Sequence, residues 1–125
     1  MPARFLEDGE HPLYEIKANL FKALAHPARI RILEILSTDP EPTGVRDILN
    51  ATGLEPTLLS QHLAVLKRHQ VVTAERVGNA VFYRLAHPQV SELLRIARIF
   101  LTDTLAARKE QLNAVRSLPA IGPTP

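Results

Sequence analysis

The feature that most constrains the fold is a short turn between two amphipathic helical segments in the middle of the chain. A helix that begins after Thr43, which can act as its N-cap, is expected to end at Gly53, because glycine readily adopts the left-handed backbone that closes a helix. After two further residues, Pro56 suits the first position of a second helix, which continues to about Gln70. The apolar residues of this second helix recur on one face at Leu59, Leu63 and Leu66. Two helices joined by so short a turn containing glycine predict a helix-turn-helix.

The segments on either side of this motif complete the predicted fold. Apolar residues at helical spacing predict helices over residues 12–24 and, after a proline, over about 27–37. The second of these should be the centre of the core, because apolar side chains wrap most of its circumference. Residues 71–86 are rich in β-branched and aromatic side chains around a turn at Gly78, and a last helix is expected over about 88–115. The predicted fold class is mainly α, a winged helix-turn-helix of about five helices plus one β-hairpin wing.

The chain length fits a single domain with two short appendages. The 125 residues are close to the usual size of one domain. We expect residues 1–11 to be a flexible acidic N-terminal arm and residues 12–115 to be the winged helix-turn-helix dimerising domain. Residues 116–125 contain several prolines and are expected to form a flexible tail.

The composition excludes several classes of function. The chain has no cysteine, so it has no disulfide, no thiolate metal site and no cysteine nucleophile. It also lacks a glycine-rich phosphate loop and a Ser/His/Asp set on rigid neighbouring elements, and we therefore do not expect an enzyme. Charged residues interrupt every apolar stretch before it reaches the roughly 18 residues of a membrane span. Because the acidic residues after Arg4 also make a poor secretory signal, a cytoplasmic protein is expected.

The second helix of the motif predicts double-stranded DNA as the partner. With its leucines turned inward, the outward positions near its start carry side chains that can reach base edges: Thr57, Leu58, Ser60, Gln61 and His62. Lys67 and Arg68 follow at positions suited to phosphate contacts. In the hairpin, Arg76 and Asn79 flank the tip, and Arg84 on the returning strand can meet a phosphate or enter a narrow minor groove.

The last helix predicts a homodimer. Its apolar band is wider than one neighbouring element needs, and on a lone chain it would leave a large exposed hydrophobic patch. We expect the first and last helices to form the interface, through Leu94, Ala97, Leu101 and Leu105 together with Leu13, Ile16 and Leu20. A two-fold dimer would place its two DNA-reading helices about 34 Å apart, which is one turn of DNA.

Three stretches of the chain carry a resemblance to a known family. They are residues 25–29 (AHPAR), residues 59–66 (LSQHLAVL) and the glycine-tipped hairpin over residues 71–85. Together they resemble the ArsR/SmtB family of bacterial winged-helix repressors, over roughly residues 13–105. The resemblance implies a homodimer formed by the first and last helices, an operator with two half-sites, and repression that a small effector, commonly a metal ion, relieves or strengthens.

The metal ligands of that family are not at their usual places in this chain. Where many members have a Cys-x-Cys pair, this chain has Gly44-Val45-Arg46, and the last helix has no histidine to join Asp103 or Glu110. A response to a divalent ion such as nickel or zinc would need other nitrogen and oxygen ligands. The local cluster of suitable residue types is Asp8, Glu10, His11 and Glu15.

Three interpretations of the function remain open from the sequence. The first is a sequence-specific repressor that responds to a divalent metal ion. The second is a repressor of the same family with no metal effector. The third is a winged-helix module whose main partner is another protein, unknown from the sequence, which the net charge of only +2 and the acidic N-terminal segment allow.

Overall fold

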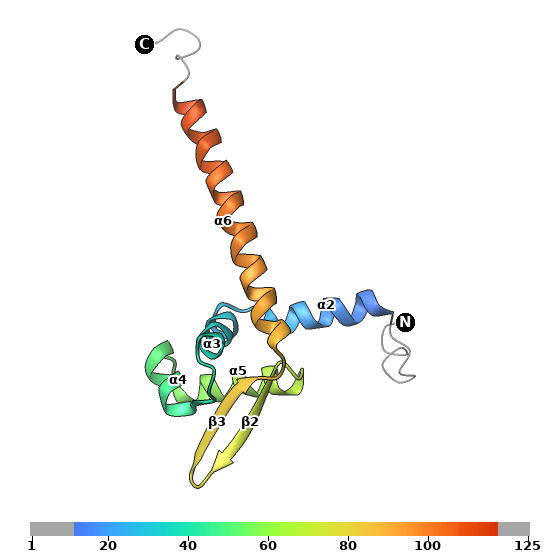
Figure 1. The fold of residues 1–125 in the computed structure, drawn as a ribbon, viewed down its shortest axis with the longest axis vertical. Coiled ribbons are helices and arrows are strands. Elements are labelled where there is room, and N and C mark those ends of the chain that lie inside the picture. The colour runs from blue at the N-terminus through green and yellow to red at the C-terminus, as the bar shows by residue number, and fades with distance from the viewer. Residues whose placement is uncertain (1–11, 118–125) are drawn as a thin grey trace. The chain divides into compact units, whose positions relative to one another are not determined.

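The computed structural model describes residues 12–117, which form five helices and three strands (Figure 1). The chain divides into two compact units after Ser91. The first unit contains the helix-turn-helix and the sheet, and the second contains the greater part of the last helix. The predicted arm over residues 1–11 and residues 118–125 of the predicted tail lie outside the described residues.

Two helices open the described part of the chain. α2 spans Leu13–Leu24, and α3 spans Pro27–Thr38. The break between them follows from the sequence, because Pro27 takes the first position of α3 and His26 caps it. The imidazole Nδ1 of His26 accepts a hydrogen bond from the amide of Ala28 at 3.0 Å. As predicted, α3 lies in the core, with three buried side chains: Ile32, Leu33 and Leu36.

The first helix of the motif, α4, spans Val45–Thr52 and ends at Gly53, whose φ of 69° confirms the predicted left-handed cap. The prediction that Thr43 caps the start of α4 is wrong. Thr43 and Gly44 instead form a short strand, β1, and Gly44 is the N-cap residue. Because β1 pairs with the hairpin, the Thr43 side chain is buried in the fold and is not available to the first turn of α4.

The second helix of the motif, α5, spans Pro56–Arg68. Pro56 opens it as predicted, and Glu55 caps it by accepting hydrogen bonds from the amides of Thr57 and Leu58 at 3.2 and 3.1 Å. A glutamate in this position satisfies two amide groups that have no partner inside the helix. The start of α5 is therefore fixed by its own sequence.

The predicted end of α5 at Gln70 is two residues late. Gln70 has a φ of 60°, in the left-handed region, so the helix closes before it. The amides of Gln70 and Val71 return to the carbonyls of Lys67 and Leu66 at 3.0 and 2.9 Å. These two hydrogen bonds form a Schellman motif, in which Gln70 occupies the position that glycine usually takes.

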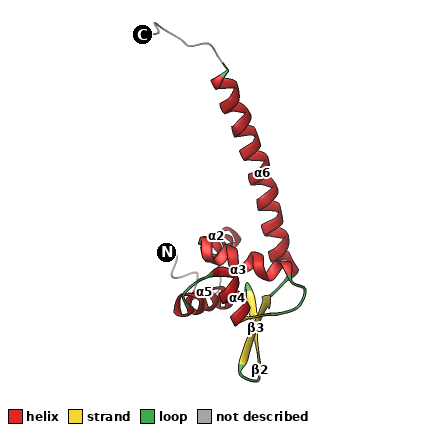
Figure 2. Cartoon of the chain, turned by 90° about the vertical axis from the view of Figure 1, so that its left-hand side faces the viewer, coloured by secondary structure: helices red, strands yellow, loops and turns green. Residues whose placement is uncertain are grey.

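The hairpin consists of β2, Val72–Val77, and β3, Ala80–Leu85, and we call it the wing. Gly78 turns the chain between the two strands with a φ of 63°. The strand order is β1-β3-β2, all antiparallel, so the sheet has one short strand more than the predicted hairpin. Figure 2 shows the wing projecting beyond the helix-turn-helix.

The core joins α5 to the rest of the first unit. Its largest side chains with almost no exposed area come from α3, α4, α5 and β2: Ile32, Leu33, Ile48, Leu59, Leu66 and Val72. Burying each such side chain contributes about 1.5 to 3 kcal/mol. The inner face of α5 packs against α2, α3 and β2, and this packing fixes the direction of its outer face.

The last helix, α6, spans Pro88–Arg116, 29 residues, and begins and ends within one residue of the prediction. None of its residues is buried in the single chain. Its exposed large apolar side chains are Ile96, Ile99, Phe100, Leu101, Leu105, Leu112 and Val115. Among the helices of residues 12–117, none is both long enough and apolar enough to cross a membrane.

Candidate nucleic-acid interface

The outer face of α5 carries most of the predicted base-reading side chains. Thr57, Ser60 and Gln61 are exposed, and Leu58 retains 40% of its area. On the opposite face Leu59 and Leu63 are buried. The outer face of α5 therefore carries hydroxyl and amide groups, which can donate hydrogen bonds to base edges in a major groove and accept hydrogen bonds from them.

The prediction that His62 points outward is wrong, because its side chain is 95% buried, with a relative exposure of 5%. His62 lies three residues after Leu59 and four before Leu66, so the helical repeat places it on the inner face. Its Nδ1 accepts a hydrogen bond from Nε of Arg29 at 3.2 Å, and its ring centroid lies 4.4 Å from that of His26. Burial lowers the pKa of His62, and His26 and Arg29 lower it further. His62 therefore lies inside the fold, on the inner face of α5.

The predicted basic residues lie on exposed surface. Lys67 and Arg68 are exposed in the last turn of α5, and Arg76 and Asn79 are exposed at the tip of the wing. Arg84 is exposed on β3, where its Nε donates to the hydroxyl of Thr73 on β2 at 3.4 Å. Lysine and arginine in these places have the chemistry for phosphate contacts.

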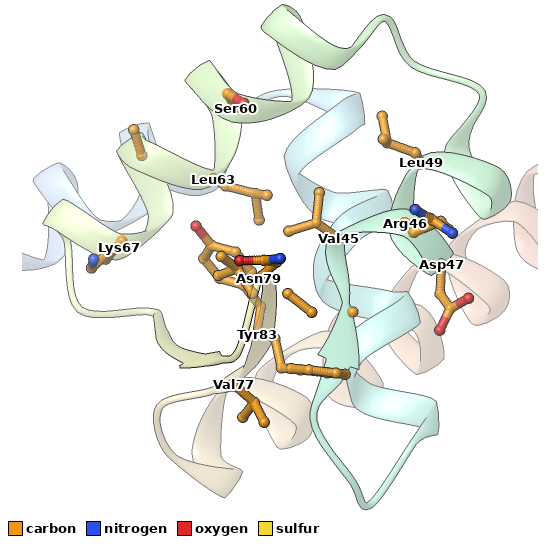
Figure 3. A pocket seen from close by; sticks show the side chains of 15 residues that line it. Val45, Arg46, Asp47, Leu49, Ser60, Leu63, Lys67, Val77, Asn79 and Tyr83 are labelled. Carbon is orange, nitrogen blue, oxygen red and sulfur yellow. The ribbon is translucent and has the colours of Figure 1, made fainter.

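A groove of about 1020 Å³ joins these elements. It runs between the first turn of α4, the exposed side of α5 and the wing, and Figure 3 shows Tyr83 extending from β3 toward α5 across it. Three of the predicted contact residues line it, namely Ser60, Lys67 and Asn79. The structure thus brings parts of the reading helix and the wing to one continuous surface.

Arg46 and Tyr83 also line this groove and were not among the predicted contact residues. Arg46 is exposed in the first turn of α4, where no side chain caps the helix and its partial positive charge favours anions. Asp47 lines the same wall and is the acidic exception. The signal for Arg46 was its place at the start of the first motif helix, because that helix crosses the DNA backbone in helix-turn-helix proteins.

The predicted metal cluster falls largely outside the described residues, which include only Glu15 of its four members. Within residues 12–117, no group of three or more His, Cys, Asp or Glu side chains could hold a metal ion. His26 and His62 lie together, but the Nδ1 lone pair of each already accepts an N–H hydrogen bond. A neutral imidazole has one such lone pair, so this histidine pair does not fit a metal.

The predicted dimer residues are accessible in the single chain. Leu13, Ile16, Ala97, Leu101 and Leu105 are exposed, and Leu20 and Leu94 are partly exposed. Each belongs to an apolar stripe of α2 or α6, so both helices can offer an apolar face to another molecule.

Comparison with known proteins identifies the family of this chain. The sequence model described as "Bacterial regulatory protein, arsR family" matches residues 26–74, which include α3, α4 and α5. The HTH-type transcriptional regulator Rv0081 of Mycobacterium tuberculosis is 48% identical over 107 residues, covering 85% of this chain and 92% of the relative. The HTH-type transcriptional repressor SmtB of the same species is 35% identical over 82 residues, covering 66% of this chain and 59% of the relative.

Solved structures show the same fold. The crystal structure of M. tuberculosis Rv0081 matches with a TM-score of 0.71 at 49% identity, over 78% of this chain and 97% of that one. The homodimeric winged helix-turn-helix DNA-binding domain of Mb0332 from Mycobacterium bovis matches with a TM-score of 0.67 at 32% identity, over 74% and 84%. The chain therefore belongs to the arsR family of bacterial regulatory proteins, and it is a winged helix-turn-helix DNA-binding transcriptional regulator and not an enzyme.

Proposed function

We propose that this regulator is a homodimeric repressor that recognises a specific DNA operator through α5 and the wing. The observation that carries the proposal is the exposed polar face of α5, with Ser60 and Gln61 outward and Leu59 and Leu63 buried behind them. In this arrangement α5 enters the major groove and its side chains read base edges. The basic residues of the wing contact the neighbouring phosphates and add affinity without sequence preference.

The dimer and the repression are supported by the apolar stripes and by the relatives. The apolar side chains of α6 are exposed in the single chain, and Leu101 keeps 54% of its area. The related Mb0332 domain is described as homodimeric, and the related SmtB is named a repressor. Two copies related by a two-fold axis would meet an operator with two half-sites about one DNA turn apart.

Operator binding of base-contact variants tests the proposal directly. The operator would be found by footprinting the DNA upstream of the protein's own gene, and affinities would be measured by fluorescence anisotropy at fixed salt. Gln61→Ala should cost about 1 to 3 kcal/mol at the operator and little on unrelated DNA, because it removes a base contact. Arg76→Ala should weaken binding to all sequences and reduce its salt dependence, because it removes a phosphate contact.

A matched control accounts for net charge. Lys109→Ala removes one positive charge from α6, away from the predicted contact residues in sequence, and should leave operator affinity within a factor of about two. Operator binding by Gln61→Ala and Ser60→Ala as tight as wild type would show that this face does not read bases. Capture of a partner protein by a wild type that has no salt-sensitive DNA affinity would instead favour the protein-interaction module.

We also propose that a divalent ion such as nickel or zinc is the effector of the repressor. It is supported by Glu15, whose Oε2 is buried without a hydrogen-bond partner in the described structure. The ion would be held by Glu15 together with Asp8, Glu10 and His11, and it must bind the DNA-competent and incompetent states differently to act. Calorimetric titration of wild type, His11→Ala and Glu15→Gln with nickel and zinc tests it, and equal heats from all three proteins would remove these ligands from consideration.

A further inference from the structure

The recognition helix α5 carries a titratable group on the face opposite its DNA-reading residues. His62 is 5% exposed and packs against α3 and the α2–α3 junction. Arg29 of α3 donates from Nε to Nδ1 of His62 at 3.2 Å and from Nη1 to the carbonyl of Ala23 at 3.2 Å. Arg29 thus joins the end of α2 to the middle of the recognition helix.

These contacts define the protonation state of His62. Nδ1 accepts the hydrogen bond from Arg29, so the neutral ring carries its proton on Nε2. Nε2 is buried and has no hydrogen-bond partner in the described structure. A second proton would have to go on Nδ1, where it would point at a guanidinium N–H and replace the hydrogen bond with repulsion between two cations.

No carboxylate is among the groups that act electrostatically on His62. The two groups that act on it electrostatically are both basic, His26 and Arg29. The elements packed on α5 are α2, α3 and β2. The other charged side chains on these elements are Glu15, Lys17, Lys22, Arg31, Glu34, Glu75 and Arg76, and those on α5 itself are Lys67 and Arg68. The hydrogen bond from Arg29 to Nδ1 and the two basic neighbours therefore favour the neutral ring of His62.

We propose that neutral His62 positions the recognition helix through Arg29, and that protonation of His62 on acidification releases this contact and weakens operator binding. The inference rests on the proposed function, because it assumes that α5 reads the operator. It adds a proton-sensitive contact on the inner side of the same helix.

The sign of the effect follows from linkage. When α5 is docked, burial and the two basic neighbours hold the pKa of His62 below its ordinary value of 6.5. When α5 is undocked or the chain is unfolded, His62 takes a proton at its ordinary pKa. The docked state therefore has its full stability above the ordinary pKa and loses it as the pH falls toward the lower pKa of the docked state.

This sign is opposite to the general effect of acid on DNA binding. Exposed histidines gain positive charge as the pH falls and so strengthen the attraction to phosphates. His69, exposed at the C-cap of α5, provides a matched control. His62→Gln keeps a side-chain oxygen that can accept from Arg29 but cannot titrate.

The experiment measures operator affinity and urea unfolding of the full chain from about pH 8 to about pH 5.5 at constant ionic strength. Wild type and His69→Gln should lose operator affinity and stability on acidification relative to His62→Gln, by up to about tenfold per pH unit for each proton taken up. Parallel pH profiles for wild type and His62→Gln would overturn the proposal. A pH-dependent stability difference without an affinity difference would also overturn it, because His62 would then act on folding alone.

The protonation state of His62 can also be measured by NMR spectroscopy on the wild-type protein, without any variant. Ring ¹⁵N shifts of wild-type His62 should report a neutral ring protonated at Nε2 at neutral pH, and an imidazolium there would refute the inference. Failure of the proposed function is distinguishable, because wild type would then show no operator-selective binding at any pH while its unfolding would still depend on His62.

Discussion

The two helices of the motif end in the same backbone conformation but with different residues, and exchanging those residues should shift stability in opposite directions. Gly53 has a φ of 69° after α4, and Gln70 has a φ of 60° after α5. A left-handed conformation costs a residue with a Cβ about 1 to 2 kcal/mol. The greater entropy of glycine in the unfolded chain offsets about 0.5 to 1 kcal/mol of this. We therefore expect Gly53→Ala to destabilise and Gln70→Gly to stabilise the fold, each by about 1 kcal/mol.

The surroundings of Gly53 make this a test of conformation alone. A Cβ added there would meet nothing within 4 Å, so neither a clash nor a new contact contributes to the result. Chemical denaturation at one fixed protein concentration measures both variants, since stability of a dimer depends on concentration. Gln70→Ala is the matched control and should be near neutral, because it keeps a Cβ. Shifts of the same sign in Gly53→Ala and Gln70→Gly would refute the reasoning.

Three further perturbations test the cap, the core and the dimer. The amide hydrogen bonds from Thr57 and Leu58 hold the pKa of Glu55 below its ordinary value of 4.5, so the ionised Glu55 side chain stabilises the fold above that pH and this stabilisation is lost as the pH falls through the lower pKa of the folded state. Glu55→Gln should therefore flatten the acid side of a plot of unfolding free energy against pH. An unchanged acid side would contradict the capping role of Glu55. Leu66→Ala, at a side chain with no exposed area, should cost about 2 to 5 kcal/mol in chemical denaturation, whereas the more exposed Leu58→Ala should cost less than about 1 kcal/mol. Leu101→Glu should raise the monomer fraction in analytical ultracentrifugation, and an unchanged dimer would place the interface elsewhere.

The boundaries that sequence analysis predicted well are those set by local chemistry. Proline fixes its own φ and suits a first helical position, and α3, α5 and α6 all begin at a proline. Glycine has ready access to positive φ, and Gly53 ends α4. The end of α5 was missed because Gln70 takes the same conformation without the residue type that signals it.

The features that sequence analysis missed depend on contacts between distant residues. Thr43 has the residue type of a helix cap, but its backbone pairs with Tyr83, 40 residues later. His62 has the residue type of a DNA contact, but its hydrogen-bond partner is Arg29, 33 residues earlier. Its position between Leu59 and Leu66 on the helical repeat indicates the inner face of α5, and this position is a better guide to its burial than its residue type.

The apolar stripe of α6 ties the stability of the proposed dimer to its binding of an operator with two half-sites. Helices in proteins gain most of their stability from packing, and no residue of this 29-residue helix is buried in the single chain. A second copy that covers Leu101 and Leu105 would supply that packing and would bring two recognition helices into one molecule. A substitution that separates the copies must then lower both stability and operator affinity. A substitution of Gln61, on the exposed face of α5, must lower operator affinity alone, so the two kinds of variant separate the dimer from the DNA-reading face.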